Sequence, residues 1–207
     1  MQQENNTPII IGHRANTLND IYRYYYKHNL RMVELDVNLT QDKKIAIEHD
    51  NVSMKRMKHL IRDNILVLDD VLRNIPNDLT INIEIKRYES IQARQNRLPN
   101  DIITKIIMAV KKRGKKNVLY SSFDREIVRI TLKNKRDGML LLKEDSDLEN
   151  LEGYPHICIE KSLLDRLDSI NLYEKKIIYV YDVKSDELES LKAKYSFIKG
   201  WIVDFNE

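Results

Sequence analysis

The stretch VELDVNLTQDKKIAIEHD, from Val33 to Asp50, contains two apolar runs on either side of a polar turn. The first run carries Glu34 and Asp36 two positions apart, and the second leads into His49. Side chains two apart on a strand lie on the same face, so the two acids point the same way. Runs that are otherwise apolar have no structural need of these groups. The pattern predicts that all three meet at a functional site.

The turn between the two runs sets their pairing. A two-residue turn at Asp42 and Lys43 pairs positions whose numbers add up to about 85. This register places His49 beside Asp36. We therefore expect an antiparallel hairpin that brings His49 back to the acids.

Short runs rich in Ile, Val, Leu or Tyr recur along the rest of the chain, with helical patterns between them. They predict strands at Ile9–Gly12, Met32–Val37, Thr80–Lys86, Asn117–Ser122, Met139–Lys143, Ile157–Glu160, Ile177–Asp182 and Trp201–Asp204. The patterns between them predict helices at Leu18–His28, Leu68–Asn74, Asp101–Arg113, Arg125–Lys133, Ser162–Leu172 and Asp186–Tyr195. Most of the strands are apolar on both faces, as parallel strands covered by helices are.

The alternation of strands and helices is typical of βα units around a parallel sheet. The number of strands predicts a closed (β/α)₈ barrel of the TIM type, with the hairpin as an extension after the second strand. An open doubly wound sheet stays as the alternative, although no Gly-rich phosphate loop follows the first strand. We expect residues 1–207 to form this single barrel domain, because no linker or repeat divides the sequence.

The composition excludes several classes of protein. Hydrophobic residues make up 42% of the chain and charged residues 32%, which indicates a folded domain rather than a disordered one. The net charge of +3 is too small for a dedicated nucleic-acid binder. Neither a signal peptide nor an apolar stretch of about 20 residues is apparent. We expect a cytoplasmic protein without stable membrane insertion, as a monomer or small homo-oligomer.

Two further strand ends carry charged groups. IIIGHR delivers His13 and Arg14, and TINIEIKR delivers Glu84 and Lys86 on one face. In a barrel, the C-terminal ends of the strands are where active sites are built. A network of surface ion pairs is the structural alternative, but these positions lie at predicted strand ends rather than on helix faces.

The types of residue indicate chemistry on a phosphate group. An all-oxygen cluster of Glu34, Asp36 and Glu84 suits Mg²⁺, Ca²⁺ or Mn²⁺ and poorly suits Zn²⁺. Histidines titrate near neutral pH, so the two at the strand ends can serve as general acid and base. Arg14 and Lys86, together with a divalent cation, fit a phosphate.

The motifs resemble a known family when they are taken in order. GHR, ELDV followed by a turn and EHD, and NIEIK are similar to those of glycerophosphodiester phosphodiesterases, in the phospholipase C-like barrel superfamily. LVLDDVLRNIP, YSSFD and GWIVDF resemble further segments of that family. Each motif alone is common, whereas the ordered set covers nearly the whole chain.

The resemblance implies metal-dependent hydrolysis of a small-molecule substrate, a glycerophosphodiester, to sn-glycerol 3-phosphate and an alcohol. The residues that it implies are the metal ligands Glu34, Asp36 and Glu84, the phosphate-binding Arg14 and Lys86, and the acid–base pair His13 and His49. Analogy with the superfamily makes His13 the base and His49 the acid. Direct attack by water and attack by the glycerol 2-hydroxyl through a cyclic phosphate both stay open.

The sequence also departs from the family pattern. Asn16-Thr17 is what is left of a longer Pro-Glu-Asn-Thr motif, whose Glu is absent, and Tyr181 stands where an aromatic wall is expected. The segment 51–65, of about fifteen residues, is too short for a cap with its own core, so we expect a loop or one short helix there.

Two other functions stay open. A phosphodiesterase or cyclising lyase acting on lysophospholipid or phosphoinositide head groups would use the same residues. A catalytically silent barrel would bind a phosphorylated ligand without turnover, although a decayed site would be expected to lose some of the set.

Overall fold

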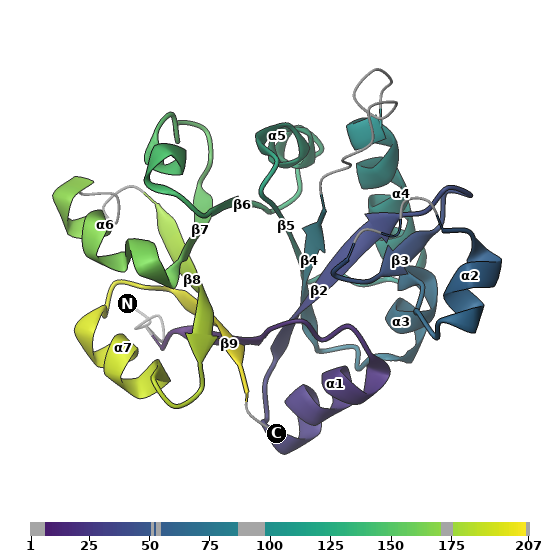
Figure 1. Ribbon diagram of the computed structural model, residues 1–207, viewed down its shortest axis with the longest axis horizontal. Coiled ribbons are helices and arrows are strands. Elements are labelled where there is room, and N and C mark those ends of the chain that lie inside the picture. The colour runs from purple at the N-terminus through teal and green to yellow at the C-terminus, as the bar shows by residue number, and fades with distance from the viewer. Residues whose placement is uncertain (1–6, 51, 53–54, 87–97, 171–175, 206–207) are drawn as a thin grey trace.

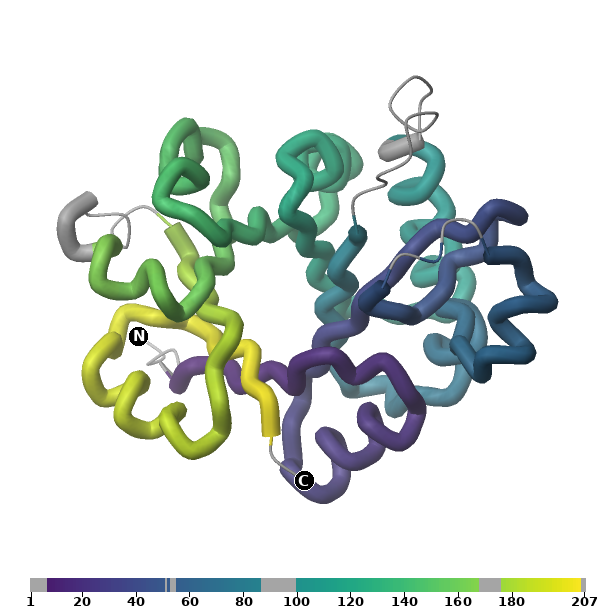
Figure 2. Tube along the Cα trace, in the orientation of Figure 1, coloured from purple at the N-terminus to yellow at the C-terminus, as the bar shows by residue number. Residues whose placement is uncertain are grey.

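The computed structural model describes residues 7–50, 52, 55–86, 98–170 and 176–205. Within these residues, parallel strands close into a ring with helices around it (Figure 1). The order around the ring is β1-β2-β4-β5-β6-β7-β8-β9, and β9 pairs with β1 to complete it. The chain trace in Figure 2 follows the same ring from the N-terminal to the C-terminal strand. The predicted TIM-type barrel is confirmed, and the open-sheet alternative is wrong.

Each predicted element is present, with small differences at its ends. The barrel strands are β1 (Ile9–Gly12), β2 (Met32–Leu39), β4 (Thr80–Ile85), β5 (Val118–Ser122), β6 (Gly138–Leu142), β7 (His156–Glu160), β8 (Ile177–Lys184) and β9 (Gly200–Asp204). The α-helices between them are α1 (Leu18–Tyr22), α3 (Leu68–Asn74), α4 (Leu98–Lys112), α5 (Arg125–Lys133), α6 (Leu164–Ile170) and α7 (Leu188–Lys194). The helix predicted for Leu18–His28 is α1 followed by a π-helical turn, Arg23–Lys27. Leu172, the predicted end of another helix, lies outside the described residues.

The hairpin after the second strand is present, but its predicted register is wrong by one residue. β3 (Ile45–Ile47) pairs antiparallel with β2, and Val37 lies opposite Ile47. The N–H of Glu48 therefore donates to the carbonyl of Asp36, where the predicted register placed His49. His49 lies beyond the paired part of the hairpin.

The cause of the shift is a longer turn than the sequence suggested. Thr40 pairs with Lys44, which leaves Gln41, Asp42 and Lys43 between them. Lys43 adopts a left-handed conformation, with φ of 61°. A three-residue turn that ends in a left-handed residue is a common hairpin loop, and each added turn residue moves the register by one.

The interior of the barrel is filled by alternate side chains of its strands. Its apolar floor consists of Ile11, Met32, Leu119, Met139, Leu141, Cys158, Tyr179 and Ile202, all buried. Side chains on the other faces of the strands pack against the surrounding helices in two larger apolar clusters. This division leaves the C-terminal ends of the strands free to carry polar groups.

One short helix follows the hairpin, as the sequence suggested for the segment 51–65. This helix, α2 (Met57–Arg62), buries Leu60 against Ala46 and Val52. Residues 51, 53 and 54 of the segment lie outside the described part. Among the helices in the described ranges, none has the length and apolar character needed to cross a membrane.

Candidate active site

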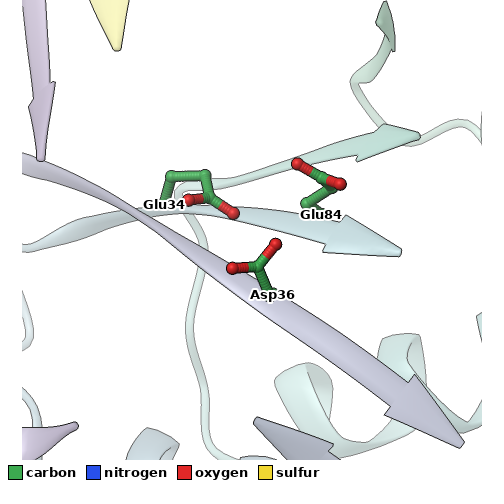
Figure 3. A group of neighbouring side chains, drawn as sticks. All are labelled: Glu34, Asp36 and Glu84. Carbon is green, nitrogen blue, oxygen red and sulfur yellow. The ribbon is translucent and has the colours of Figure 1, made fainter. Parts of the chain in front are cut away.

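Three carboxylates meet at the C-terminal ends of β2 and β4. Asp36 lies opposite Glu84 in the parallel register, and Glu34 lies two residues before Asp36 on the same face. Glu34 and Asp36 are each 1% exposed and Glu84 is 8% exposed. One oxygen from each side chain lies within 4.8 Å of the others, and Figure 3 shows the three groups pointing toward one another. The structure thus brings the three predicted metal ligands together.

The environment of this triad penalises its negative charge. Burial raises the pKa of Glu34 well above its ordinary value, and the charges of Asp36 and Glu84 raise it further. Burial also raises the pKa of Glu84. Oε1 of Glu34 is buried and has no hydrogen-bond partner among the residues that the structure describes. A hard divalent cation would offset the repulsion and engage this oxygen, so the triad fits such an ion.

Lys86 supplies a positive charge at the edge of the triad. Its Nζ lies 2.6 Å from Oδ1 of Asp36 and 2.5 Å from Oε1 of Glu84. Burial alone lowers the pKa of Lys86, but the two carboxylates outweigh burial and raise it above its ordinary value. The ammonium group is therefore charged at neutral pH. It contacts Asp36 and Glu84, and the Lys86 side chain also lines the cavity above them.

Asn16 fixes Asp36 from the loop after β1. Its Nδ2 donates to Oδ2 of Asp36 at 2.9 Å, and its Oδ1 accepts from the backbone N–H of Asp36 at 3.0 Å. The next residue, Thr17, begins α1 through a capping box with Asp20. The loop after β1 therefore keeps a polar contact with the site through Asn16, a role that the sequence did not predict for this residue.

His13 follows β1 and is held by the last strand of the barrel. Its Nδ1 lies 2.8 Å from Oδ1 of Asp204. This hydrogen bond lowers the pKa of Asp204, so the carboxylate is ionised and accepts the hydrogen of Nδ1. Nε2 of His13 is then the basic nitrogen of the ring.

Asp204 was not among the site residues that the sequence predicted. The available signal was the acid in GWIVDF, which is the last residue of the closing strand, because that strand of a barrel pairs with the first one. Gly12 lies opposite Val203 in that pairing, which sets the next residue of each strand side by side.

A tight contact beneath β1 also shapes this strand end. The ring of Tyr24 packs so closely on Gly12 that a Cβ there would lie 2.5 Å from it. The hydroxyl of Tyr24 donates to the carbonyl of His13 at 2.9 Å. The glycine of the GHR motif is thus required by packing rather than by chemistry.

Arg14 connects the triad to His49. Its backbone is left-handed, with φ of 49°, and its N–H donates to Oε2 of Glu34 at 2.8 Å. Its guanidinium lies 2.8 Å from Nε2 of His49, whose Nδ1 lies 3.2 Å from Oδ1 of Asp50. Arginine has no acceptor, so Nε2 of His49 accepts and Nδ1 carries the hydrogen. A left-handed non-glycine residue stores strain, and here that strain accompanies contacts with two site groups.

A cavity of about 580 Å³ opens above the triad, a size typical of small-molecule sites. Its lining includes all of the predicted site residues except Asp36, namely His13, Arg14, Glu34, His49, Glu84 and Lys86. The hairpin therefore delivers His49 to the mouth in spite of the shifted register.

The opposite wall of the cavity is formed by β5 to β8. Tyr181 lines it, at the position where the sequence predicted an aromatic wall, and its ring meets that of Phe123 edge-on, with centroids 5.9 Å apart. Lys143, Glu160 and Asp182 also line this wall and were not anticipated. The pairing of β8 with β9 shifts its register between Val180 and Val183, where Asp182 is left-handed, with φ of 63°. An irregularity of this kind changes the direction in which the side chains beside it point.

Comparison by sequence gives no match to a family model and no match to a curated protein. In three dimensions the chain is similar to a glycerophosphodiester phosphodiesterase from Thermotoga maritima, with 21% identity, a TM-score of 0.73, and 96% of this chain and 95% of the other covered. A glycerophosphodiester phosphodiesterase from Parabacteroides distasonis gives 17% identity, a TM-score of 0.75 and coverage of 95% and 92%. A phosphodiesterase from Oleispira antarctica, in complex with the product sn-glycerol-3-phosphate, gives 18% identity, a TM-score of 0.77 and coverage of 95% and 93%. The resemblance seen in the sequence thus extends to three dimensions, and this chain has the barrel fold of the glycerophosphodiester phosphodiesterases.

Proposed function

We propose that this protein hydrolyses glycerophosphodiesters to sn-glycerol 3-phosphate and an alcohol, in a metal-dependent reaction. The observation that carries the proposal is the meeting of a buried carboxylate triad, a guanidinium and two histidines at one cavity. The solved phosphodiesterase with sn-glycerol-3-phosphate bound supports the class of substrate. We also propose that residues 1–207 form one domain, and that the protein is cytoplasmic and a monomer or small homo-oligomer.

Glu34, Asp36 and Glu84 would together hold one divalent cation. Carboxylate oxygens suit Mg²⁺ or Ca²⁺, and Mn²⁺ is the third candidate. Such a cation, when bound, stabilises the negative charge that develops on phosphoryl oxygens. Arg14 and Lys86 would bind the remaining oxygens of the phosphate. The planar guanidinium of Arg14 suits two parallel hydrogen bonds to a phosphate, and the ammonium of Lys86 acts as a point charge.

His13 is suited to act as the general base. Asp204 keeps the hydrogen on Nδ1, so Nε2 can take a proton from the attacking hydroxyl. The same role serves an attacking water and the 2-hydroxyl of glycerol. The carboxylate of Asp204 would then stabilise the imidazolium that forms.

His49 is suited to act as the general acid only after a change in its contacts. Its Nε2 accepts from Arg14, so it has no hydrogen to donate at that atom. A substrate phosphate would compete for the guanidinium, because an anionic phosphoryl oxygen is a stronger acceptor than an imidazole nitrogen. Release of Nε2 would let His49 gain a proton and deliver it to the leaving alkoxide.

A product assay tests the proposal. Glycerophosphocholine, a lysophospholipid and a phosphoinositide are each incubated with the protein, with and without Mg²⁺ or Ca²⁺, and phosphorus NMR identifies the products. We expect release of sn-glycerol 3-phosphate that depends on the metal. A persistent cyclic phosphate, or turnover of lysophospholipid or phosphoinositide substrates alone, would select a cyclising lyase or head-group phosphodiesterase. Binding of glycerol phosphate without turnover of any diester would select a silent barrel.

A pair of matched variants separates the site from general effects of substitution. Glu84→Gln removes one predicted ligand, and Glu189→Gln makes the same change at a side chain that is 81% exposed on α7. We expect the first variant to lose metal-dependent turnover and the second to keep it. Equal activity of the two would contradict the proposed role of the triad.

A further inference from the structure

Two buried polar side chains in the barrel interior have no role in the chemistry described above. Asn82 on β4 is 0% exposed and Ser121 on β5 is 1% exposed. Both amide atoms of Asn82 and the hydroxyl of Ser121 lack a hydrogen-bond partner within the described ranges of the chain. In folded proteins, buried groups of this kind are almost always bonded to protein or to ordered water.

The register of the strands places both side chains beside the carboxylate triad. Asn82 lies opposite Glu34, and Ser121 lies opposite Glu84. Neighbouring strands are about 4.8 Å apart, and in-register neighbours share a face. Since Glu84 lines the cavity, Asn82 two residues earlier also points into the barrel. Asn82 therefore lies level with Glu34 and two residues below Glu84. Ser121 lies level with Glu84 and two residues above Leu119 of the apolar floor.

The chemistry of these groups selects their partner. The amide of Asn82 offers two N–H donors and an oxygen with two acceptor lone pairs, and the hydroxyl of Ser121 offers one donor and two acceptor lone pairs. A metal cation would engage only the oxygens and would leave the amide N–H groups unpaired. Water donates and accepts, and a buried water usually makes about three hydrogen bonds to groups that are otherwise unpaired. Water is thus the occupant that fits.

We infer that Asn82 and Ser121 hold ordered water in the barrel interior, beside the triad, and that this water hydrogen-bonds to Glu34 and Glu84. Oxygens of the triad that do not face a cation would accept from it. Asn82 and Ser121 are then positioning residues, which act on the metal through the carboxylates. The part that concerns the metal rests on the proposed function, and the hydration of the interior does not.

Binding of the metal alone tests the positioning role. Asn82→Leu keeps the approximate volume and removes the amide, Ser121→Ala removes the hydroxyl, and Met32→Leu is the control, an apolar change at the lower end of β2. Calorimetric titration with Mg²⁺, Ca²⁺ and Mn²⁺ should show affinity about 10–100-fold weaker for Asn82→Leu, the usual effect of losing an outer partner of a metal ligand. Ser121→Ala should weaken it less, and Met32→Leu should leave it unchanged.

Two further readouts separate positioning from loss of fold. Thermal unfolding without metal should give Asn82→Leu a melting temperature equal to or above that of the wild type, because the variant no longer buries a polar amide. Saturating metal should restore its kcat. Wild-type affinity in both Asn82→Leu and Ser121→Ala would overturn the positioning role, and if Asn82→Leu fails to fold, Ser121→Ala decides alone.

A high-resolution crystal structure tests the hydration directly. We expect a water within about 3 Å of both Asn82 and Ser121. A dry interior would overturn the inference even if the enzyme is active. Conversely, a protein that binds no divalent cation and cleaves no diester would contradict the proposed function, and the presence of the water would still decide this inference.

Discussion

The two histidines of the candidate site are carried by two different kinds of structure. His13 follows a strand of the closed barrel and is tied to Asp204, which is 191 residues away in the sequence. His49 follows a hairpin strand outside the barrel, and its ring nitrogens contact Arg14 and the adjacent Asp50. Barrel closure fixes the first position through many strand pairings, whereas a local turn fixes the second. The difference explains why the hairpin register was mispredicted and the barrel was not.

The largest expected effect comes from the barrel side of this comparison. Glu34→Gln should lower kcat/KM by about 10³-fold or more, because loss of this proposed metal ligand would remove several kcal/mol of transition-state stabilisation. Without metal, the Glu34→Gln variant should be at least as stable to thermal unfolding as the wild type at neutral pH. Burial and the neighbouring acids raise the pKa of Glu34, so its ionised form costs stability above the ordinary carboxylate pKa, and Gln removes this cost. Steady-state kinetics and thermal unfolding at two pH values check both points.

Substituting each histidine in turn compares the barrel position of His13 directly with the hairpin position of His49. His13→Ala and His49→Ala should each lower kcat by about 10²–10⁴-fold, the usual range for a positioned acid or base. A diester with a very good leaving group needs no general acid and should partly rescue His49→Ala only. Rescue of His13→Ala instead would reverse the two roles, and near wild-type turnover of either variant would remove its role.

The hairpin can be broken without touching the barrel. Lys43→Pro is incompatible with φ of 61° and removes the N–H that donates to Thr40, so the turn must rearrange. Because this displaces His49, turnover should fall by about 10–10³-fold, at most the loss seen without the histidine. Metal affinity and the far-UV circular dichroism spectrum should be unchanged. Weakened metal binding in this variant would show that the hairpin also supports the triad.

The smallest effects concern the acids beside the two histidines. Asp204→Asn removes a charged hydrogen bond of about 1.5–3 kcal/mol and should lower kcat by about 10–10²-fold. Asp50 has a side chain that is 89% exposed, so Asp50→Asn should change kcat by less than about threefold, as exposed pairs contribute little. Measurement of kcat for both variants under one condition makes the comparison. Equal losses would mean that the hairpin histidine is oriented as firmly as the barrel histidine.

Local sequence patterns were sufficient for the elements and for part of the site. Apolar runs of strand length, separated by helical patterns, place β1 to β9 and the helices between them within a few residues. The spacing of two residues puts Glu34 and Asp36 on the same face of their strand, and it does the same for Glu84 and Lys86, whatever the rest of the chain does. Parallel strands then bring these ends to one side of the barrel.

What the sequence by itself determined is therefore the barrel, the end of it that carries the candidate site and the acids that converge there. The tertiary structure alone decided the hairpin register and the pairing of His13 with Asp204. It also decided the contact of Asn16 with Asp36 and the edge-on packing of Phe123 against Tyr181. The physical reason is the distance along the sequence over which each interaction acts. Periodicity reports which face of a strand a side chain occupies, but a contact between distant segments depends on turn conformation and on which strand ends become neighbours when the sheet closes.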